Sequence, residues 1–398
     1  MVACFGGWSL DALDVQIFSF VIPSLLALWG ITTAEAGELA TVTLMVSAFG
    51  GWISGALSDR FGRVRILQIT ILWYAVFTFL CGFAQNFNQL FVLKAIQGFG
   101  FGGEWAAGAV LMGEVIRDRY RGRAVGLVQT GWSIGWGAAA LLYTLLSATL
   151  PEAMTWRLMF WIGLAPAALV FWVRRFVQEP PQQARPAQSG GPMHIFAALR
   201  QPYLSITLRV SLMVTGAQGA TYAISTFLPT YLKTQRHLTA IGTGSYLMVL
   251  ILGAFFGFLS GAYLADAIGR KATFMVSALG SVVLMLVYLF APLSNDMILP
   301  VGFLLGYVNY MMFSPMGPFM TELFPAAVRG VGQGFCYNVG RGIGAIFPAL
   351  VGFLAARLGL AGAIAVFSFA GLALMIMALL MLPETKGQSL QSIDRQHA

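Results

Sequence analysis

The sequence predicts an all-α integral membrane protein with twelve transmembrane helices in two pseudo-symmetric six-helix bundles. Composition is the first observation behind this fold class. Of the 398 residues, 58% are hydrophobic and only 10% are charged, and the mean hydropathy is +0.78. A soluble chain of this length needs far more charge on its surface. The second observation is that two charged turns recur at nearly the same spacing in the two halves of the chain.

The first repeated turn has the pattern Asp-x-x-Gly-Arg between two long apolar stretches. It begins at Asp59 and returns at Asp266, 207 positions later. The glycine lets a helix end in a tight turn, the aspartate can pair with arginines or helix termini, and the basic residues favour an anionic membrane surface. We therefore expect gating turns that contain Gly55, Asp59, Arg60, Gly62 and Arg63 in the first half, and Asp266, Gly269 and Arg270 in the second.

The second repeated turn reads Glu, six residues, Arg-Gly. It occurs at Glu114 to Arg121 and again at Glu322 to Arg329, with both residues displaced by 208 positions. Two independent turns that repeat at nearly the same spacing indicate two similar halves of about six helices each. We include these four residues among the expected gating residues.

Apolar stretches long enough to cross a bilayer fix the order of the predicted helices. They lie at about 3–29, 36–58, 66–86, 89–113, 122–149, 156–176, 205–231, 240–262, 271–292, 297–320, 330–356 and 361–382. The predicted domains are a bundle over 1–176, a linker rich in Pro, Gly and Gln over 177–203, a bundle over 204–386 and a tail over 387–398. The first stretch is too long for a signal peptide, and the sequence leaves open whether a further tail precedes it.

The distribution of basic residues predicts the orientation. Of the 23 Lys and Arg residues, seventeen fall in the segments on one side of the predicted membrane and four on the other. The positive-inside rule then places both termini in the cytoplasm of a bacterial-type inner membrane. The net charge of +8 is explained by this bias and needs no nucleic-acid partner.

Acidic residues within the predicted spans are the first candidates for function. Asp11 and Asp14 are three residues apart and lie on nearly one face of the first helix. Glu104 lies near the middle of the fourth span. Because a bare carboxylate in a membrane is costly, each should bind substrate or a proton, or else pair with a structural partner. Lys94 lies nearer the outer end of the fourth span, where its side chain could extend to the interface or serve as a functional cation.

Arg341 is the one basic residue that we place near the middle of the membrane, roughly 16 Å from the inner end of the eleventh span. Its guanidinium keeps its proton and has the shape to bind a carboxylate. It therefore pairs either with a protein acid or with an anionic substrate. Neutral polar candidates for the same cavity, each with packing as the alternative role, are Gln129, Trp132, Gln218, Asn309 and Asn338.

The sequence lacks the marks of other function classes. The three cysteines offer neither a disulfide framework nor metal-ligand spacing, and the three histidines lie outside the predicted spans. There is no Gly-x-x-x-x-Gly-Lys loop for ATP and no nucleophile–base constellation. We therefore expect no enzyme activity and no cofactor, with energy supplied by an ion gradient.

These turns resemble the inner-loop signatures of the major facilitator superfamily, as does Pro383-Glu-Thr-Lys-Gly387 near the end of the chain. The second turn departs from the fuller pattern, with Ala262 in place of Gly55 and Ala267 in place of Arg60. Two patterns resemble those of the branch of bacterial organic-acid–proton symporters, which includes sialate, lactate and aromatic-acid carriers. They are Trp8 with Asp11 and Asp14, and the run 102–105. The resemblance implies two six-helix bundles around a cavity that opens alternately to each side.

Three functions remain open at this stage. The first is proton-coupled symport of a small monocarboxylate by a monomeric protein. The second is transport of neutral sugars, or export of drugs or metabolites. The third is a membrane sensor or a membrane enzyme. Arg341 opposite acidic helices favours the first. The sequence does not identify the acid, the direction of transport, the coupling ion or the carboxylate that carries the proton.

Overall fold

The computed structural model describes residues 2–115, 121–165, 167, 197–325 and 328–387. Its description excludes the side chains at 2–4, 56, 58–60, 63, 103–115, 121–125 and 197. Most of the predicted linker 177–203 and tail 387–398 therefore lie outside the described residues. So do the side chains of six predicted site residues: Asp59, Arg60, Arg63, Glu104, Glu114 and Arg121.

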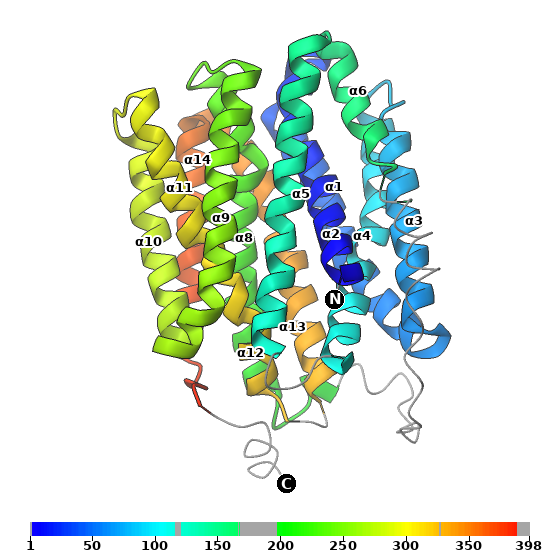
Figure 1. Ribbon diagram of the computed structural model, residues 1–398, viewed down its shortest axis with the longest axis vertical. Helices are drawn as coiled ribbons and strands as arrows, with labels where there is room; N and C mark the ends of the chain where they lie inside the picture. Colours follow the sequence, from blue (N-terminus) through cyan, green and yellow to red (C-terminus); the bar gives the residue numbers. More distant parts are fainter. Residues whose placement is uncertain (1, 116–120, 166, 168–196, 326–327, 388–398) are drawn as a thin grey trace.

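The described chain forms a bundle of long helices that run between two ends of the molecule (Figure 1). The helices of the first half are α1 (Val2–Trp29), α2 (Thr33–Phe61), α3 (Arg63–Cys81), α4 (Phe87–Val115), α5 (Arg121–Thr149) and α6 (Glu152–Ile162). A short 3-10 turn, η3 (Ala197–Leu199), precedes the second half. The helices there are α8 (Leu204–Thr234), α9 (Ala240–Ile268), α10 (Arg270–Phe290), α11 (Asn295–Met311), α12 (Phe313–Leu323), α13 (Arg329–Gly344) and α14 (Ile346–Leu380).

The helices have the length and composition of membrane spans. Among the described residues, seven helical stretches are long and apolar enough to cross a bilayer, and the last of them covers both α13 and α14. Helix α8 is as long as these but carries many Ser and Thr residues. Nearly all its side chains from Val210 to Leu232 are buried, so these polar groups face protein rather than lipid.

Two predicted spans are broken by prolines, which the predicted boundaries did not show. A proline ring clashes with the carbonyl group four residues earlier. Four residues before Pro315 is Met311, where α11 ends, and four residues before Pro348 is Gly344, where α13 ends. The predicted boundary between the last two spans lies at Gly359, which has a φ of 72° and kinks α14.

The glycines of the two Asp-x-x-Gly-Arg turns adopt the same unusual backbone. Gly62 separates α2 from α3 with a φ of 94°, and Gly269 separates α9 from α10 with a φ of 107°. Residues with a Cβ rarely take these values. The structure therefore confirms that each glycine ends a helix in a tight turn. We call the end of the molecule that carries these turns the basic end, and the opposite end the distal end.

Helices α2 and α14 join the two halves toward the distal end. The Thr33 hydroxyl donates to the Gly352 carbonyl at 2.9 Å. A Cβ at Gly352 would lie 2.1 Å from the Thr33 carbonyl oxygen, and one at Gly37 would lie 2.4 Å from the Pro348 carbonyl oxygen. Only glycine permits so close an approach of two helix backbones.

An ion pair also crosses between the halves at the distal end. Lys233, near the end of α8, pairs with Glu152 at the start of α6. The Ser24 hydroxyl donates to the same carboxylate at 3.0 Å. The two charged side chains are 28% and 39% exposed, so the ion pair is within reach of solvent.

Candidate functional site

Arg341 is buried between the two halves of the protein. It lies on α13 and is 1% exposed. A Cβ on Gly340 would lie 2.5 Å from the Val214 side chain, so glycine beside Arg341 lets α13 pack tightly on α8. The guanidinium carbon lies 4.2 Å from the centre of the Phe101 ring on α4, within the range of a cation–π contact.

The guanidinium of Arg341 forms no ion pair with an acid among the described residues. Its Nε and Nη1 atoms have no hydrogen-bond partner among the described residues, and none of the described carboxylates forms an ion pair with it. Its neighbours are aromatic: the Tyr222 hydroxyl interacts with it, and Tyr337 lies within electrostatic range. A buried cation with free donors is an arrangement suited to an anionic ligand.

Helices of both halves surround this position. Leu44 of α2, Phe101 of α4, Tyr222 of α8 and Ala345 form one buried apolar cluster, and Trp132 of α5 packs against it. The site therefore lies at the interface of the halves, where a change in their relative position would alter it.

Aromatic side chains extend from Arg341 across the interface. Tyr222 interacts electrostatically with Tyr310 of α11. The Tyr310 ring lies 5.4 Å from that of Trp136 on α5. Trp8 of α1 lies 5.1 Å from Trp132. We call the set Arg341, Tyr222, Tyr310 and Trp136 the central wall.

A second polar cluster lies within the first half, around Asp14. This carboxylate is 1% exposed and accepts hydrogen bonds from the Thr78 hydroxyl of α3 and, at 2.6 Å, from Gln97 Nε2 of α4. The same Gln97 Nε2 donates to Thr78 Oγ1 at 2.7 Å. Asp14 is thus held by neutral donors, an environment in which a carboxylate can gain or lose a proton.

The expectation that Lys94 extends to the membrane interface is wrong. The side chain is 1% exposed, its Nζ lies 4.8 Å from the centre of the Phe18 ring, and it interacts electrostatically with Asp14. It faces into the first bundle because a carboxylate and an aromatic face are available there, which the position of Lys94 along its helix could not show.

The other predicted binding residues mostly gather near the interface of the halves. Asp11 is fully buried and interacts electrostatically with Tyr337, which also contacts Gln218. Asn338 donates to the Gly334 carbonyl at 2.9 Å, and its Oδ1 lies against Gly51 of α2. The Gln129 side chain donates to the Phe313 carbonyl at 3.4 Å, and Asn309 is 2% exposed.

Our sequence reasoning gave no role to several residues that the structure brings to these clusters. They are Thr78, Gln97, Phe101, Trp136 and Tyr337. Tyr337 is a tyrosine within an apolar span, where a hydroxyl needs a polar neighbour, and this was the available signal.

The second predicted gating turn forms a charged cluster within the second half. Arg270 binds Asp266 at 2.5 Å and takes Glu322 in a two-point contact, at 3.0 Å from Nη2 and 3.3 Å from Nε. Arg329 donates through Nε to the backbone carbonyls of Thr321 and Phe324 at the end of α12. These contacts join α9, α10, α12 and α13, and their role in gating stays a prediction.

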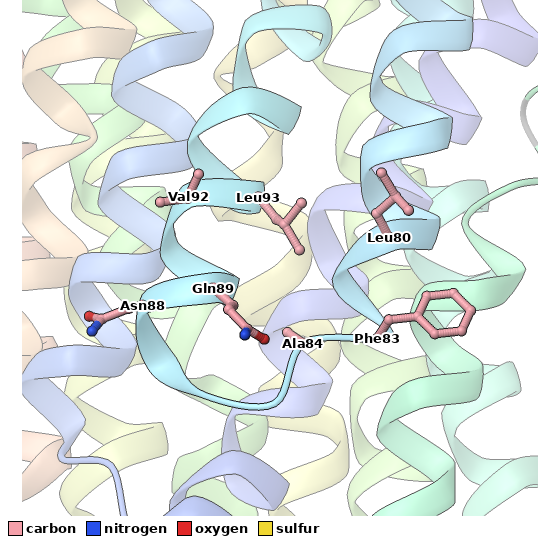
Figure 2. A pocket seen from close by; sticks show the side chains of 7 residues that line it. All are labelled: Leu80, Phe83, Ala84, Asn88, Gln89, Val92 and Leu93. Atoms are coloured by element: carbon pink, nitrogen blue, oxygen red, sulfur yellow. The ribbon is translucent and has the colours of Figure 1, made fainter.

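A surface pocket of about 570 Å³ lies between the end of α3 and the start of α4 (Figure 2). Its lining includes Leu80, Phe83, Val92 and Leu93, and both Phe83 and Val92 are more than half exposed. The pocket belongs to one half of the molecule and carries no charged side chain. We therefore assign the candidate site to the surroundings of Arg341 instead.

Comparisons with known proteins agree with this architecture. A family model described as the Major Facilitator Superfamily matches residues 4–347 and 261–397. Two solved structures of the xylose transporter XylE, one bound to 6-bromo-6-deoxy-D-glucose and one inward-open form from E. coli, have TM-scores of 0.77 and 0.76. Each is 17% identical and covers 99% of this chain and 98% of its own, so the likeness shows the fold.

Among curated relatives, a probable 4-methylmuconolactone transporter of Cupriavidus pinatubonensis is 42% identical over 100% of this chain and 92% of its own. The cis,cis-muconate transport protein of Acinetobacter baylyi is 31% identical over 87% and 84% of the two chains. The sialic acid transporter NanX of Escherichia coli is 27% identical over 93% and 90%. With the family model covering nearly the whole sequence, this multi-pass membrane protein belongs to the major facilitator superfamily of transporters.

Proposed function

We propose that the protein is a secondary transporter that carries a small organic acid, as its anion, together with a proton. The observation that carries this proposal is Arg341, a guanidinium that is 1% exposed and has no carboxylate partner among the described residues. A buried unpaired cation is costly in a membrane, so the ligand that completes the site should be negative. A substrate carboxylate can take two parallel hydrogen bonds from Arg341, which lysine cannot reproduce.

The relatives support an organic acid as the substrate, and two of them support an unsaturated one. Their names specify 4-methylmuconolactone, cis,cis-muconate and sialic acid as substrates, and muconate and sialic acid are organic acids by name. The aromatic side chains around Arg341 favour a flat, conjugated body, because such a molecule can pack against ring faces. A neutral sugar or drug would bring no counter-charge to the guanidinium.

Coupling to protons is the second part of the proposal. Asp11, Asp14 and Glu104 are the candidate proton carriers. Of the two whose side chains are described, Asp14 has the environment better suited to the role because its hydrogen-bond donors are neutral. The excess of basic residues supports placing the basic end and both termini in the cytoplasm of an inner membrane. The protein would then work by alternating access, with the two bundles moving about the Arg341 site.

Uptake into proteoliposomes tests the proposal. Radiolabelled 4-methylmuconolactone, muconate, benzoate and xylose are supplied with and without an inward proton gradient. We expect accumulation of an acid that the gradient increases, and none of xylose. Losing a buried charge pair costs about 2–5 kcal/mol, so Arg341→Lys should weaken binding of the acid by at least about tenfold. Arg341→Ala should nearly eliminate it.

Arg357→Lys is the matched control, since Arg357 lies exposed on the second half of the chain. It should transport like the wild type. Equal affinity for the acid and its amide, or wild-type affinity in Arg341→Lys, would show that Arg341 is structural. The neutral-substrate alternative would then take precedence.

A further inference from the structure

The central wall ends in a hydrogen-bond donor that lacks a partner. Trp136 is 1% exposed, and its indole Nε1 has no hydrogen-bond partner among the described residues. An indole N–H can only donate. Because buried donors are normally paired, an acceptor on a ligand bound along the wall would satisfy this one.

The wall connects this donor to Arg341. Tyr222 interacts with the guanidinium and with Tyr310, and the Tyr310 ring packs on the ring of Trp136. These contacts run from α13 through α8 and α11 to α5, from one half of the protein to the other. A flat molecule lying along the wall with its carboxylate on Arg341 would therefore direct its other end toward Trp136.

The charges near the wall indicate that this other end is neutral. Arg341 is the only cation that a described contact places on the wall. Lys94, the other buried cation among the described residues, stacks on Phe18 and faces Asp14. The described acid Asp11 interacts with Tyr337, which also lies within electrostatic range of Arg341. Among the described residues, a second carboxylate would therefore be buried without a counter-ion and in the field of an acid, whereas a carbonyl oxygen needs only the indole N–H.

We propose that the substrate is a planar monocarboxylate with a neutral carbonyl oxygen at the end away from its carboxylate, and that Trp136 binds this oxygen. The inference rests on the proposed function and deepens it, since it selects keto, ester or lactone acids over simple monoacids and over dicarboxylates. Trp136 is then a specificity-determining residue and Arg341 the residue that binds the charge.

Three dienes that share a six-carbon chain separate these classes: sorbate has one carboxylate, monomethyl muconate has one carboxylate and an ester carbonyl, and muconate has two carboxylates. Calorimetry on the purified protein measures their dissociation constants. We expect monomethyl muconate to bind about 5- to 10-fold more tightly than sorbate, the gain typical of one buried hydrogen bond. Muconate should bind more weakly than its monomethyl ester.

Trp136→Phe keeps a ring against Tyr310 and removes the N–H, so it should abolish the difference between the ester and sorbate. Trp161→Phe is the matched control. The Trp161 indole N–H also lacks a described partner, but its ring packs on Phe83, away from the wall. This variant should keep the wild-type order of affinities.

Muconate binding as tightly as its ester, or an unchanged preference for the ester in Trp136→Phe, would overturn the inference. If none of the three acids binds while another acid is still taken up in an Arg341-dependent way, the inference is wrong and the proposed function stands. If uptake of every acid is independent of Arg341, the proposed function itself fails.

Discussion

Among the described acids, Asp14 has the surroundings that best fit the proposed proton carrier. Its two oxygens accept from Thr78 and Gln97, and Lys94 is near but outside ion-pair distance. A carboxylate held this way can take up a proton without breaking an ion pair. Asp14→Asn mimics the protonated form. It should abolish accumulation driven by a pH gradient while exchange of labelled for unlabelled substrate across proteoliposomes continues.

Asp296→Asn, at an exposed acid of α11, serves as the control and should accumulate substrate normally. Normal gradient-driven accumulation by Asp14→Asn would show that Asp14 is structural. The same measurement on Asp11→Asn and Glu104→Gln would then decide which of the remaining acids carries the proton.

Single residues also show what depth along a predicted helix can and cannot reveal. Depth alone places Arg341 within the membrane, and the structure shows it 1% exposed. Depth does not reveal which way a long side chain turns. Lys94 turns inward because Asp14 and Phe18, on another helix, offer it a charge and a ring face. Such partners are distant in sequence, and no single-helix pattern contains them.

At the scale of the helix, Glu384 holds the start of α10. Its carboxylate accepts the backbone N–H groups of Arg270 at 3.0 Å and Lys271 at 2.9 Å, and those of Thr385 and Lys386 from its own segment. Burial raises the pKa of Glu384, but these four donors outweigh it and lower the pKa below its ordinary value of 4.5. The charged form is therefore the one that the folded protein favours.

The lowered pKa of Glu384 determines how this residue's contribution to folding stability changes with pH. The stabilisation from Glu384 is complete above its unfolded-state pKa and is lost as the pH falls through the lower folded-state value. Glu384→Gln should therefore melt at a lower temperature than the wild type at pH 7. The difference should shrink as the pH falls below 4.5. Melting curves across this range, with Asp296→Asn as control, test the effect; a pH-independent difference would contradict it.

The helices themselves were largely predictable from apolar length, but their breaks were not. The stretch from 297 to 320 is apolar throughout, so its composition does not show a break. Helix α11 ends at Met311 because the ring of Pro315 clashes with the backbone carbonyl group of that residue. Prolines are common in membrane helices and need not break them, as Pro23 inside α1 shows. Whether a proline ends a helix or is accommodated within it depends on neighbouring side chains and helices that can hydrogen-bond to the backbone carbonyl groups that the proline leaves without a partner.

For the whole molecule, the ion pair of Lys233 and Glu152 joins the two halves at the distal end. Its partial exposure limits its contribution to about 1 kcal/mol or less, and salt should weaken it. Lys233→Gln should shift the protein toward forms in which the distal end is open. A cysteine at the buried Ala36 of α2 should then react up to about fivefold faster with a water-soluble maleimide, in a background without native cysteines.

The exchange of both charges, Lys233→Glu with Glu152→Lys, should restore slow labelling. Arg357→Gln should leave the rate unchanged. Equal labelling in all variants would show that the halves are held by helix packing alone.

The two-fold design of the molecule was the most predictable feature of all. The offset of the repeated turns already implied two similar halves, and Gly62 and Gly269 share the same left-handed backbone. The site between the halves was less accessible to prediction. Phe101, Tyr222 and Trp136 come from three different helices, and their meeting around Arg341 depends on packing that no local pattern encodes.

Thr41 of α2 occupies the gap that Pro348 opens between α13 and α14. Its hydroxyl donates to the Ala345 carbonyl at 2.7 Å and accepts from the Ala349 N–H at 3.1 Å. A side chain of one half thus completes the backbone hydrogen bonding of the other. When α2 and α14 separate, Ala345 and Ala349 lose this partner together. The junction between α13 and α14 should therefore be stiff while α2 contacts α14, and it should bend more easily once the two halves separate.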